Sequence, residues 1–219
     1  GWMVRTKRRP TTLLFHTALV LATAMAATGQ YDRWEILALG GLHLLIDAVK
    51  SGFCRDTVAA HLFDQAAHLA TIAGFAMIAP DLWTAGAWGR APGWVPHAMI
   101  LLAGAIYATR AGGFAVGKLM RPYAPQAAQQ GLEQGGLLIG LLERGLIYMM
   151  IMVNQPAGIG FLIAAKSLLR FEAASKEQKA AEYVIIGTLA SFGWAMLVAY
   201  GTQALRDALP PLEILPPQP

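Results

Sequence analysis

Charged residues are scarce in this chain of 219 residues. Only 14% are Asp, Glu, Lys or Arg, whereas a soluble domain usually carries about a quarter. Hydrophobic residues make up 56%, and the mean hydropathy is +0.46. This balance excludes a disordered chain, a nucleic-acid-binding module and an ordinary cytosolic enzyme. The net charge of +4 does not call for a nucleic-acid partner, because basic cytoplasmic loops of a membrane protein produce the same excess.

Cysteine is almost absent, and so are the short motifs of well-known enzyme classes. The single cysteine, Cys54, excludes an internal disulfide and any multi-cysteine zinc or iron–sulfur site. The chain has no His-Glu-x2-His zinc motif, no nucleophile elbow and no phosphate-binding loop. It also lacks the inverted repeat and paired broken helices of many transporters. The reaction class therefore has to be argued from the placement of individual polar residues.

Long hydrophobic runs are what the chain does contain. A membrane-spanning helix needs about 20 mostly apolar residues, and seven segments approach this length. They lie at about 11–29, 34–52, 61–79, 97–117, 136–154, 157–171 and 181–204. The sequence thus predicts an all-α, polytopic transmembrane bundle of about seven helices. We expect one transmembrane domain over 1–209 and a proline-rich tail over 210–219, because five prolines prevent a regular helix there.

The distribution of Lys and Arg predicts how the bundle is oriented. With seven spans, thirteen of the 17 basic residues fall on the side of the N-terminus. The opposite side has Arg33, Arg90 and Arg206, and Arg144 lies within a segment. This positive-inside pattern predicts a cytoplasmic N-terminus and a periplasmic C-terminus in a bacterial inner membrane. A cleaved signal peptide ending near Ala24-Met25-Ala26 is the alternative for the first segment, but His16 interrupts its apolar run.

Two consecutive segments each carry ionisable side chains on one face. His43 and Asp47 are four residues apart in the second segment, and Asp64 and His68 are four apart in the third. Residues at this spacing share a helix face. Because the two helices are antiparallel and joined by a short loop, the two pairs can face each other. Ionisable residues within spanning segments are costly and usually functional.

A divalent metal would satisfy these groups. The ionisable residues within the segments leave an excess of negative charge, which a divalent cation would neutralise. Two histidines with one or two carboxylates suit zinc, iron or manganese better than calcium. We therefore take His43, Asp47, Asp64 and His68 as candidate metal ligands. Each histidine alone, however, is more often a hydrogen-bonded packing residue.

Three further polar residues in later segments are candidate catalytic residues. Glu143 could act as a general base, and Arg144 or Lys166 could hold an anionic group such as phosphate. The structural alternative is that Glu143 and Arg144 pair with other helices to lock the bundle. Lys166 could equally belong to a basic cytoplasmic loop. The Trp-rich loop over 81–94 is expected to anchor the protein at the membrane interface.

The same polar motifs resemble an uncharacterised bacterial membrane family, domain-of-unknown-function family 3307. The resemblance rests on His43-x3-Asp47, on Phe63-x-Gln65-x2-His68 with Asp64 before the glutamine, and on a C-terminal set. That set comprises Glu143-Arg144 after Gly140, Ala164-Ala165-Lys166-Ser167-x2-Arg170-Phe171, and Glu182-Tyr183-x3-Gly187-Thr188-Leu189. Lys7 to His16 resembles the end of the family's first motif, whose earlier His and Asp would precede Gly1. The resemblance implies a bacterial membrane protein and no known activity.

Three functions fit these observations. The first is a metal-dependent hydrolase acting on a lipid-linked or membrane-proximal substrate from the cytoplasmic side. The second is a carrier for protons, ions or a small solute that uses the same residues as a relay. The third is a structural or accessory subunit of a larger membrane complex, in which the charges lock helices together. The lipid bilayer is the expected partner in each case, with other membrane subunits in the third.

Overall fold

The structure, a computed structural model, describes residues 10–53, 57–124, 134–174 and 178–212. For residues 169–174 and 178–180 the structure describes the helical backbone only. Within these ranges the chain is all-helical and has no β-strand, which confirms the predicted fold class. The basic N-terminal stretch, Cys54 and residues 213–219 of the predicted tail lie outside the described residues.

The chain divides into two compact units, Gly1–Pro92 and Gly93–Pro219. The prediction of a single transmembrane domain over 1–209 stays a prediction.

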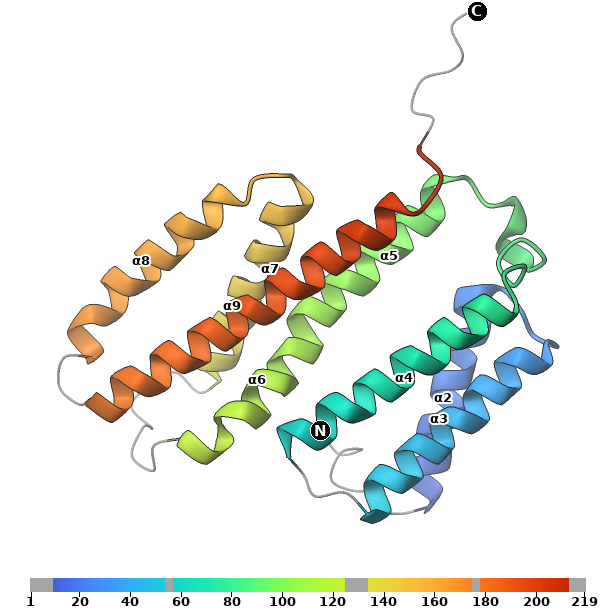
Figure 1. The fold of residues 1–219 in the computed structure, drawn as a ribbon, viewed down its shortest axis with the longest axis horizontal. Helices are drawn as coiled ribbons and strands as arrows, with labels where there is room; N and C mark the ends of the chain where they lie inside the picture. Colours follow the sequence, from blue (N-terminus) through green and yellow to red (C-terminus); the bar gives the residue numbers. More distant parts are fainter. Residues whose placement is uncertain (1–9, 54–56, 125–133, 175–177, 213–219) are drawn as a thin grey trace, which may run out of the picture. The chain divides into compact units, whose positions relative to one another are not determined.

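The described part of the first unit, over 10–53 and 57–92, contains three long helices, each antiparallel to the next. They are α2 (Pro10–Thr28), α3 (Trp34–Phe53) and α4 (Val58–Ile78). Helix α3 packs against both α2 and α4 (Figure 1). The turn between α2 and α3 is short because Gly29 adopts a left-handed φ of 67° at the end of α2. Thr57 caps α4, since its hydroxyl accepts a hydrogen bond from the backbone N–H of Ala60 at 3.2 Å.

The Trp-rich loop after α4 folds back onto the turn between α2 and α3. It contains a short 3₁₀ helix, η1 (Ala87–Arg90). The indole N–H of Trp88 donates to the carbonyl of Ala26 at 2.7 Å, and the amide of Gln30 donates to the carbonyl of Leu82 at 2.8 Å. These bonds fix the loop to the unit, so Trp88 has a structural role besides the anchoring expected of it.

In the second unit, the described residues form a long, nearly continuous helical rod and three further helices. The rod comprises α5 (Trp94–Ile106), the π-helical turn η2 (Tyr107–Ala111), α6 (Gly112–Met120) and the 3₁₀ turn η3 (Arg121–Tyr123). It is followed by α7 (Gly135–Met152), α8 (Ala157–Ala174) and α9 (Gln178–Asp207). Helix α9 lies along the rod and also packs on α7 (Figure 1).

The apolar core of the second unit lies where α7 and α9 meet the rod. Ala108 and Ile147 are completely buried there, together with Phe192, Ala195 and Ala199 of α9. A tight turn over residues 154–156 joins α7 to α8. Asn154 takes the left-handed conformation with φ of 57°, which asparagine tolerates better than most residues.

Among the described residues, five helical stretches are long and apolar enough to cross a membrane. They are Pro10–Thr28, Trp34–Phe53, Trp94–Tyr123, Gly135–Met152 and Ala181–Asp207. All seven predicted segments are helical, but the count of seven spans is not confirmed. Helix α4 is not among the five, and it carries four polar residues in eight positions, from His61 to His68. Among the residues of α8 whose side chains the structure describes, the apolar stretch is Ala157–Leu168, and this helix is therefore not one of the five.

The interior of the first unit is polar and its surface is apolar. Among its described residues, the buried polar side chains are Thr12, Gln30, Glu35, Asp47 and Asp64, whereas only Ile36 and Ala79 are buried hydrophobic residues. Large apolar side chains such as Phe15, Leu45 and Phe63 are instead more than half exposed. This inverted distribution indicates helices that are surrounded by lipid.

Candidate metal centre and basic pocket

The polar interior of the first unit contains a cluster of two carboxylates and three histidines. We call this set the His/Asp cluster. It comprises His16 from α2, His43 and Asp47 from α3, and Asp64 and His68 from α4. Both carboxylates are almost fully buried, with 2% of Asp47 and 7% of Asp64 exposed. The cluster therefore brings together all four predicted metal ligands, and it adds His16.

Asp47 is the centre of the cluster. Its Oδ2 atom lies 3.3 Å from Nε2 of His16 and 3.6 Å from Nε2 of His43. The two imidazole rings lie 5.2 Å apart between centroids. One carboxylate oxygen thus faces two imidazole nitrogens that reach it from two different helices.

Asp64 forms the second half of the cluster and is held by a cation. Its Oδ2 atom accepts hydrogen bonds from Nζ of Lys50 at 2.5 Å and from the amide of Gln65 at 3.1 Å. Its Oδ1 atom is buried and has no hydrogen bond within the described part of the chain. The ion pair joins α3 to α4 through Oδ2. It leaves Oδ1 of Asp64 available to a ligand bound in the cluster.

His68 has a defined tautomer because of its backbone contact. Its Nδ1 atom lies 2.7 Å from the carbonyl oxygen of Asp64, and a carbonyl can only accept, so Nδ1 carries the proton. In a neutral ring with this tautomer, the Nε2 atom carries the lone pair that a metal or a proton can take. It is buried and makes no hydrogen bond to any described residue. This arrangement, with the far nitrogen bonded to a backbone carbonyl, is typical of metal-binding and proton-accepting histidines.

Two overlapping sets of three side chains have ligand atoms within 4.8 Å of one another. One set is His16, His43 and Asp47, and the other is Asp47, Asp64 and His68. Ligand atoms about 2.0–2.1 Å from a tetrahedral zinc ion lie about 3.3–3.4 Å from one another. In the first set, the distances of 3.3 and 3.6 Å from Oδ2 of Asp47 to the two imidazole nitrogens are close to this value. The cluster could therefore hold a metal ion with little rearrangement.

A cavity of about 330 Å³ leads to the cluster. His43 and His68 line it together with Thr23 and Thr71, and the remaining lining is apolar or glycine, including Leu19, Leu39 and Ile72. The two histidine rings lie 4.5 Å apart between centroids. An apolar molecule entering this cavity would meet the cluster at these two rings.

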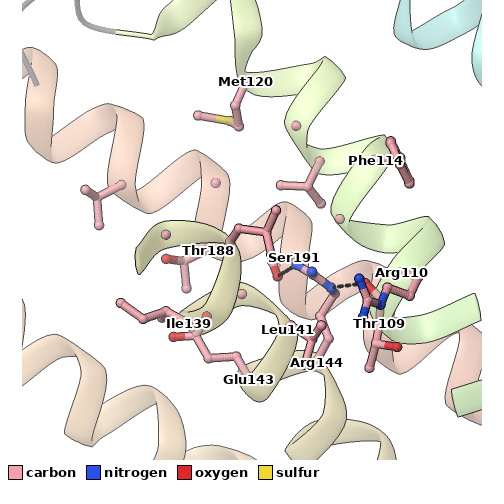
Figure 2. Close-up of a pocket in the computed structure, with 18 of the residues that line it drawn as sticks. Thr109, Arg110, Phe114, Met120, Ile139, Leu141, Glu143, Arg144, Thr188 and Ser191 are labelled. Carbon is pink, nitrogen blue, oxygen red and sulfur yellow. Dashed lines mark hydrogen bonds between the residues drawn. The ribbon is translucent and has the colours of Figure 1, made fainter. Parts of the chain in front are cut away.

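The three predicted catalytic residues lie in the second unit. Lys166 of α8 donates a hydrogen bond to Oε2 of Glu143 of α7 at 2.7 Å, and its ammonium also lies 5.3 Å from the ring centroid of Phe192. Arg144 points away from this pair, towards α9 and the rod, where it meets Ser191 and Thr109 (Figure 2). The catalytic roles predicted for these three residues stay predictions.

All three line a second cavity, of about 480 Å³, between α6, α7 and α9. We call it the basic pocket, because its lining has three basic side chains, Arg110, Arg144 and Lys166, and one acidic side chain, Glu143. Gly117 and Gly136 also line it, and a Cβ atom added at either would meet nothing within 4 Å. Each of these glycines belongs to a Gly-x3-Gly pattern, Gly113-x3-Gly117 or Gly136-x3-Gly140, a spacing that lets helices approach closely and here also leaves space in the pocket.

Sequence reasoning did not identify every member of these sites. His16 lies in the first apolar segment, but its position against α3 depends on the turn at Gly29. Lys50 follows Asp47 by three residues and shares its helix face, yet its partner on α4 depends on how the two helices pack. The π-helical turn at Tyr107–Ala111 has no sequence signature that we recognise.

No protein-family model, curated protein or solved structure matches the chain. The fold and the cluster define a class, namely helical proteins with membrane-spanning helices and a buried His/Asp cluster.

Proposed function

We propose that the chain is a metal-dependent hydrolase of a bacterial inner membrane, and that it acts on a membrane-proximal substrate. The observation that carries this proposal is the geometry of His16, His43 and Asp47. Two imidazole nitrogens lie 3.3 and 3.6 Å from one buried carboxylate oxygen, next to an apolar cavity. Metal-dependent hydrolases commonly use three protein ligands and leave one coordination position open.

The three ligands would be His16, His43 and Asp47. Two histidines and one carboxylate are donors for zinc, iron or manganese, and iron oxygenases use the same donor set. A divalent metal at this position supplies a Lewis acid that makes water nucleophilic near neutral pH. Asp47 is the ligand shared by both three-residue sets, so its loss should affect the metal most.

Asp64 and His68 would move protons beside the metal. Oδ1 of Asp64 and Nε2 of His68 are buried acceptors without hydrogen bonds in the described chain. Either atom can accept a proton from water, and Lys50 keeps the Asp64 carboxylate in place at 2.5 Å. Both residues were predicted as ligands from the sequence, and the metal content of a His68→Ala variant distinguishes the two roles.

The apolar cavity supports a lipid-like substrate. Its lining residues belong to helices whose other faces expose large apolar side chains, such as Leu14 and Leu69. A substrate that is dissolved in the bilayer can enter such a cavity without crossing a polar surface. The positive-inside pattern and the resemblance to family 3307 support the proposed membrane and a cytoplasmic N-terminus.

The test is the metal content of detergent-purified protein, measured by mass spectrometry for the wild type and variants. We expect about one zinc, iron or manganese per chain, and its loss in His43→Ala and Asp47→Asn. His61→Ala is the matched control, because His61 lies on α4 in the same unit but in neither ligand set. A metal-free wild type that remains folded would contradict the proposal.

A structural or accessory role is the second candidate, and two ion pairs favour it. Lys50–Asp64 joins α3 to α4, and Lys166–Glu143 joins α8 to α7. Such pairs lock helices in register, as a subunit of a larger complex requires. This candidate predicts that the chain copurifies with other membrane subunits and that the histidine variants assemble normally without metal.

A further inference from the structure

Arg144 is a buried cation whose hydrogen-bond partners in the described chain are neutral. Only 5% of it is exposed. Its Nε atom donates to the carbonyl of Thr109 at 3.1 Å, and Nη1 donates to the hydroxyl of Ser191 at 3.1 Å. The one acidic side chain that lines the same pocket, Glu143, accepts a hydrogen bond from Lys166. A guanidinium in a membrane-spanning helix is costly unless an anion or water compensates its charge.

The surroundings of Arg144 are built to accommodate its guanidinium. A Cβ atom added at Gly113 would lie 3.1 Å from Nη2, and one added at Gly140 would lie 3.0 Å from Nη1. At Gly112 it would lie 2.9 Å from Cδ of the arginine. These three glycines, on two helices, therefore leave the space that the arginine fills.

The π-helical turn supplies the remaining contacts. In this turn the backbone N–H of Gly112 bonds to the carbonyls of both Tyr107 and Thr109. The same two carbonyls also accept from side chains, Tyr107 from the indole of Trp194 at 3.2 Å and Thr109 from Arg144. Turns of this kind are rare, and they occur frequently at functional sites.

The basic pocket combines this charge with an apolar wall. Arg110, exposed on the π-helical turn, lies on the lining with Arg144 and Lys166. The apolar part includes Phe114, Leu137 and Ile139, whose side chains are 59, 61 and 45% exposed. The pocket therefore opens at a surface that carries large apolar side chains, and basic groups lie within it (Figure 2).

We propose that the basic pocket binds an anionic phospholipid. Its phosphate lies between Arg144 and Arg110, and an acyl chain lies along Phe114, Leu137 and Ile139. Three basic side chains against one acidic side chain favour an anion, and guanidinium groups bind phosphate with two parallel hydrogen bonds. The exposed apolar wall favours a lipid over a water-soluble phosphate. This inference is independent of the proposed metal centre, because it concerns residues of the second unit only.

The experiment is native mass spectrometry of the full chain in detergent with added lipid. Phosphatidylglycerol is compared with phosphatidylcholine of the same acyl chains, and inorganic phosphate is a third probe. We expect phosphatidylglycerol to bind with about tenfold preference, since charge-assisted hydrogen bonds are worth roughly that factor. Arg110→Gln, which removes an exposed group, should reduce the binding of phosphatidylglycerol about fivefold without affecting the fold.

Matched variants separate the pocket from general effects of charge. Arg206→Gln removes the same charge from α9 outside the pocket lining, and it should leave lipid binding unchanged. Gly113→Ala displaces the guanidinium without changing any charge and should weaken binding. Gly193→Ala is its control, because the added Cβ meets nothing within 4 Å.

Three results would overturn the assignment. One is equal binding of phosphatidylcholine and phosphatidylglycerol, and another is an Arg206→Gln effect as large as that of Arg110→Gln. The third is displacement of the lipid by millimolar inorganic phosphate, which would identify a soluble anion as the occupant.

Discussion

Among single residues, two helical glycines of the second unit differ in how closely their neighbours approach them. Gly112 faces both Trp194 and Arg144, and a Cβ atom added there would lie 2.5 Å from Cδ1 of the indole. Gly193, on α9, faces open space. The two glycines therefore differ in what an alanine would do, although both lie within helices.

The substitution Gly112→Ala should destabilise the second unit by about 1–3 kcal/mol, because the packed interior cannot take the extra methyl without displacement. Gly193→Ala should be neutral or stabilise the protein by up to about 1 kcal/mol, since alanine is the better helix former. Thermal unfolding in detergent, followed by circular dichroism, measures both. Equal melting temperatures for the two variants would contradict the contacts described at Gly112.

The ion pair of Arg33 and Asp81 predicts a pH dependence at the Trp-rich loop. Arg33 donates a hydrogen bond to Asp81 at 2.9 Å, and this bond lowers the pKa of the Asp81 carboxyl. A lowered pKa in the folded chain means that the pair contributes fully above the ordinary carboxyl range. The contribution is lost as the pH falls through the lowered value.

We therefore expect the protection of backbone amides in residues 79–93 against hydrogen exchange, taken relative to the intrinsic rate at each pH, to fall below about pH 4, where carboxyl groups take up protons. An Asp81→Asn variant should already show this loss of protection at neutral pH. Asp32→Asn is the control, because Asp32 lies in the preceding turn and makes none of the Arg33 contacts. A loop whose exchange is the same in wild type and Asp81→Asn would show that the pair does not hold it.

At the scale of helices, α8 depends on polar contacts. Helix α8 packs less extensively against α7 and α9 than those two helices pack against each other. Lys166 bonds to Glu143 of α7 and lies over the ring of Phe192 of α9. Both side chains of the ion pair are mostly buried, with 15 and 11% exposed.

A double-mutant cycle with Lys166→Met and Glu143→Gln should give a coupling energy of about 1–2 kcal/mol, which is typical of polar contacts within membranes. Lys166→Met alone should destabilise the protein more than the double variant, because it leaves Glu143 without its cation. Denaturant unfolding in mixed micelles measures the cycle. Additive effects of the two substitutions would mean that the pair does not hold α8.

The sequence predicts the helices well, but it predicts only part of the contacts that build the two sites. Apolar length alone placed all seven helical segments, since hydrophobic runs of this length have few alternatives. The one-sided spacing of His43 and Asp47, and of Asp64 and His68, predicted that α3 and α4 would share a polar face. The contact from His16 to Asp47 depends on the packing of α2 against α3, which spacing within one helix cannot reveal. The charge of Arg144 within an apolar segment made it a candidate. The three glycines that surround it lie on two helices, so the sequence alone does not show that they are its neighbours.

At the scale of the whole molecule, the orientation in the membrane can be tested with cysteine labelling. Cys54, the only cysteine, belongs to the basic side in the predicted topology, and Thr84 lies on the opposite side. A membrane-impermeant maleimide applied to intact cells should label a Cys54→Ser/Thr84→Cys variant and leave the wild type unlabelled. Labelling of the wild type after permeabilisation is the control. The reverse pattern would invert the predicted topology.

The proposed function depends above all on a metal bound by two imidazoles and a carboxylate in the first unit. X-ray absorption at the edge of the bound metal tests it most directly, because the spectrum reports the number and type of nearest ligands. We predict a shell of nitrogen and oxygen atoms at about 2.0–2.2 Å with two imidazole signatures, of which His16→Ala removes one. His61→Ala should leave the spectrum unchanged. A metal with no imidazole signature, or a spectrum that His16→Ala does not alter, would contradict the account.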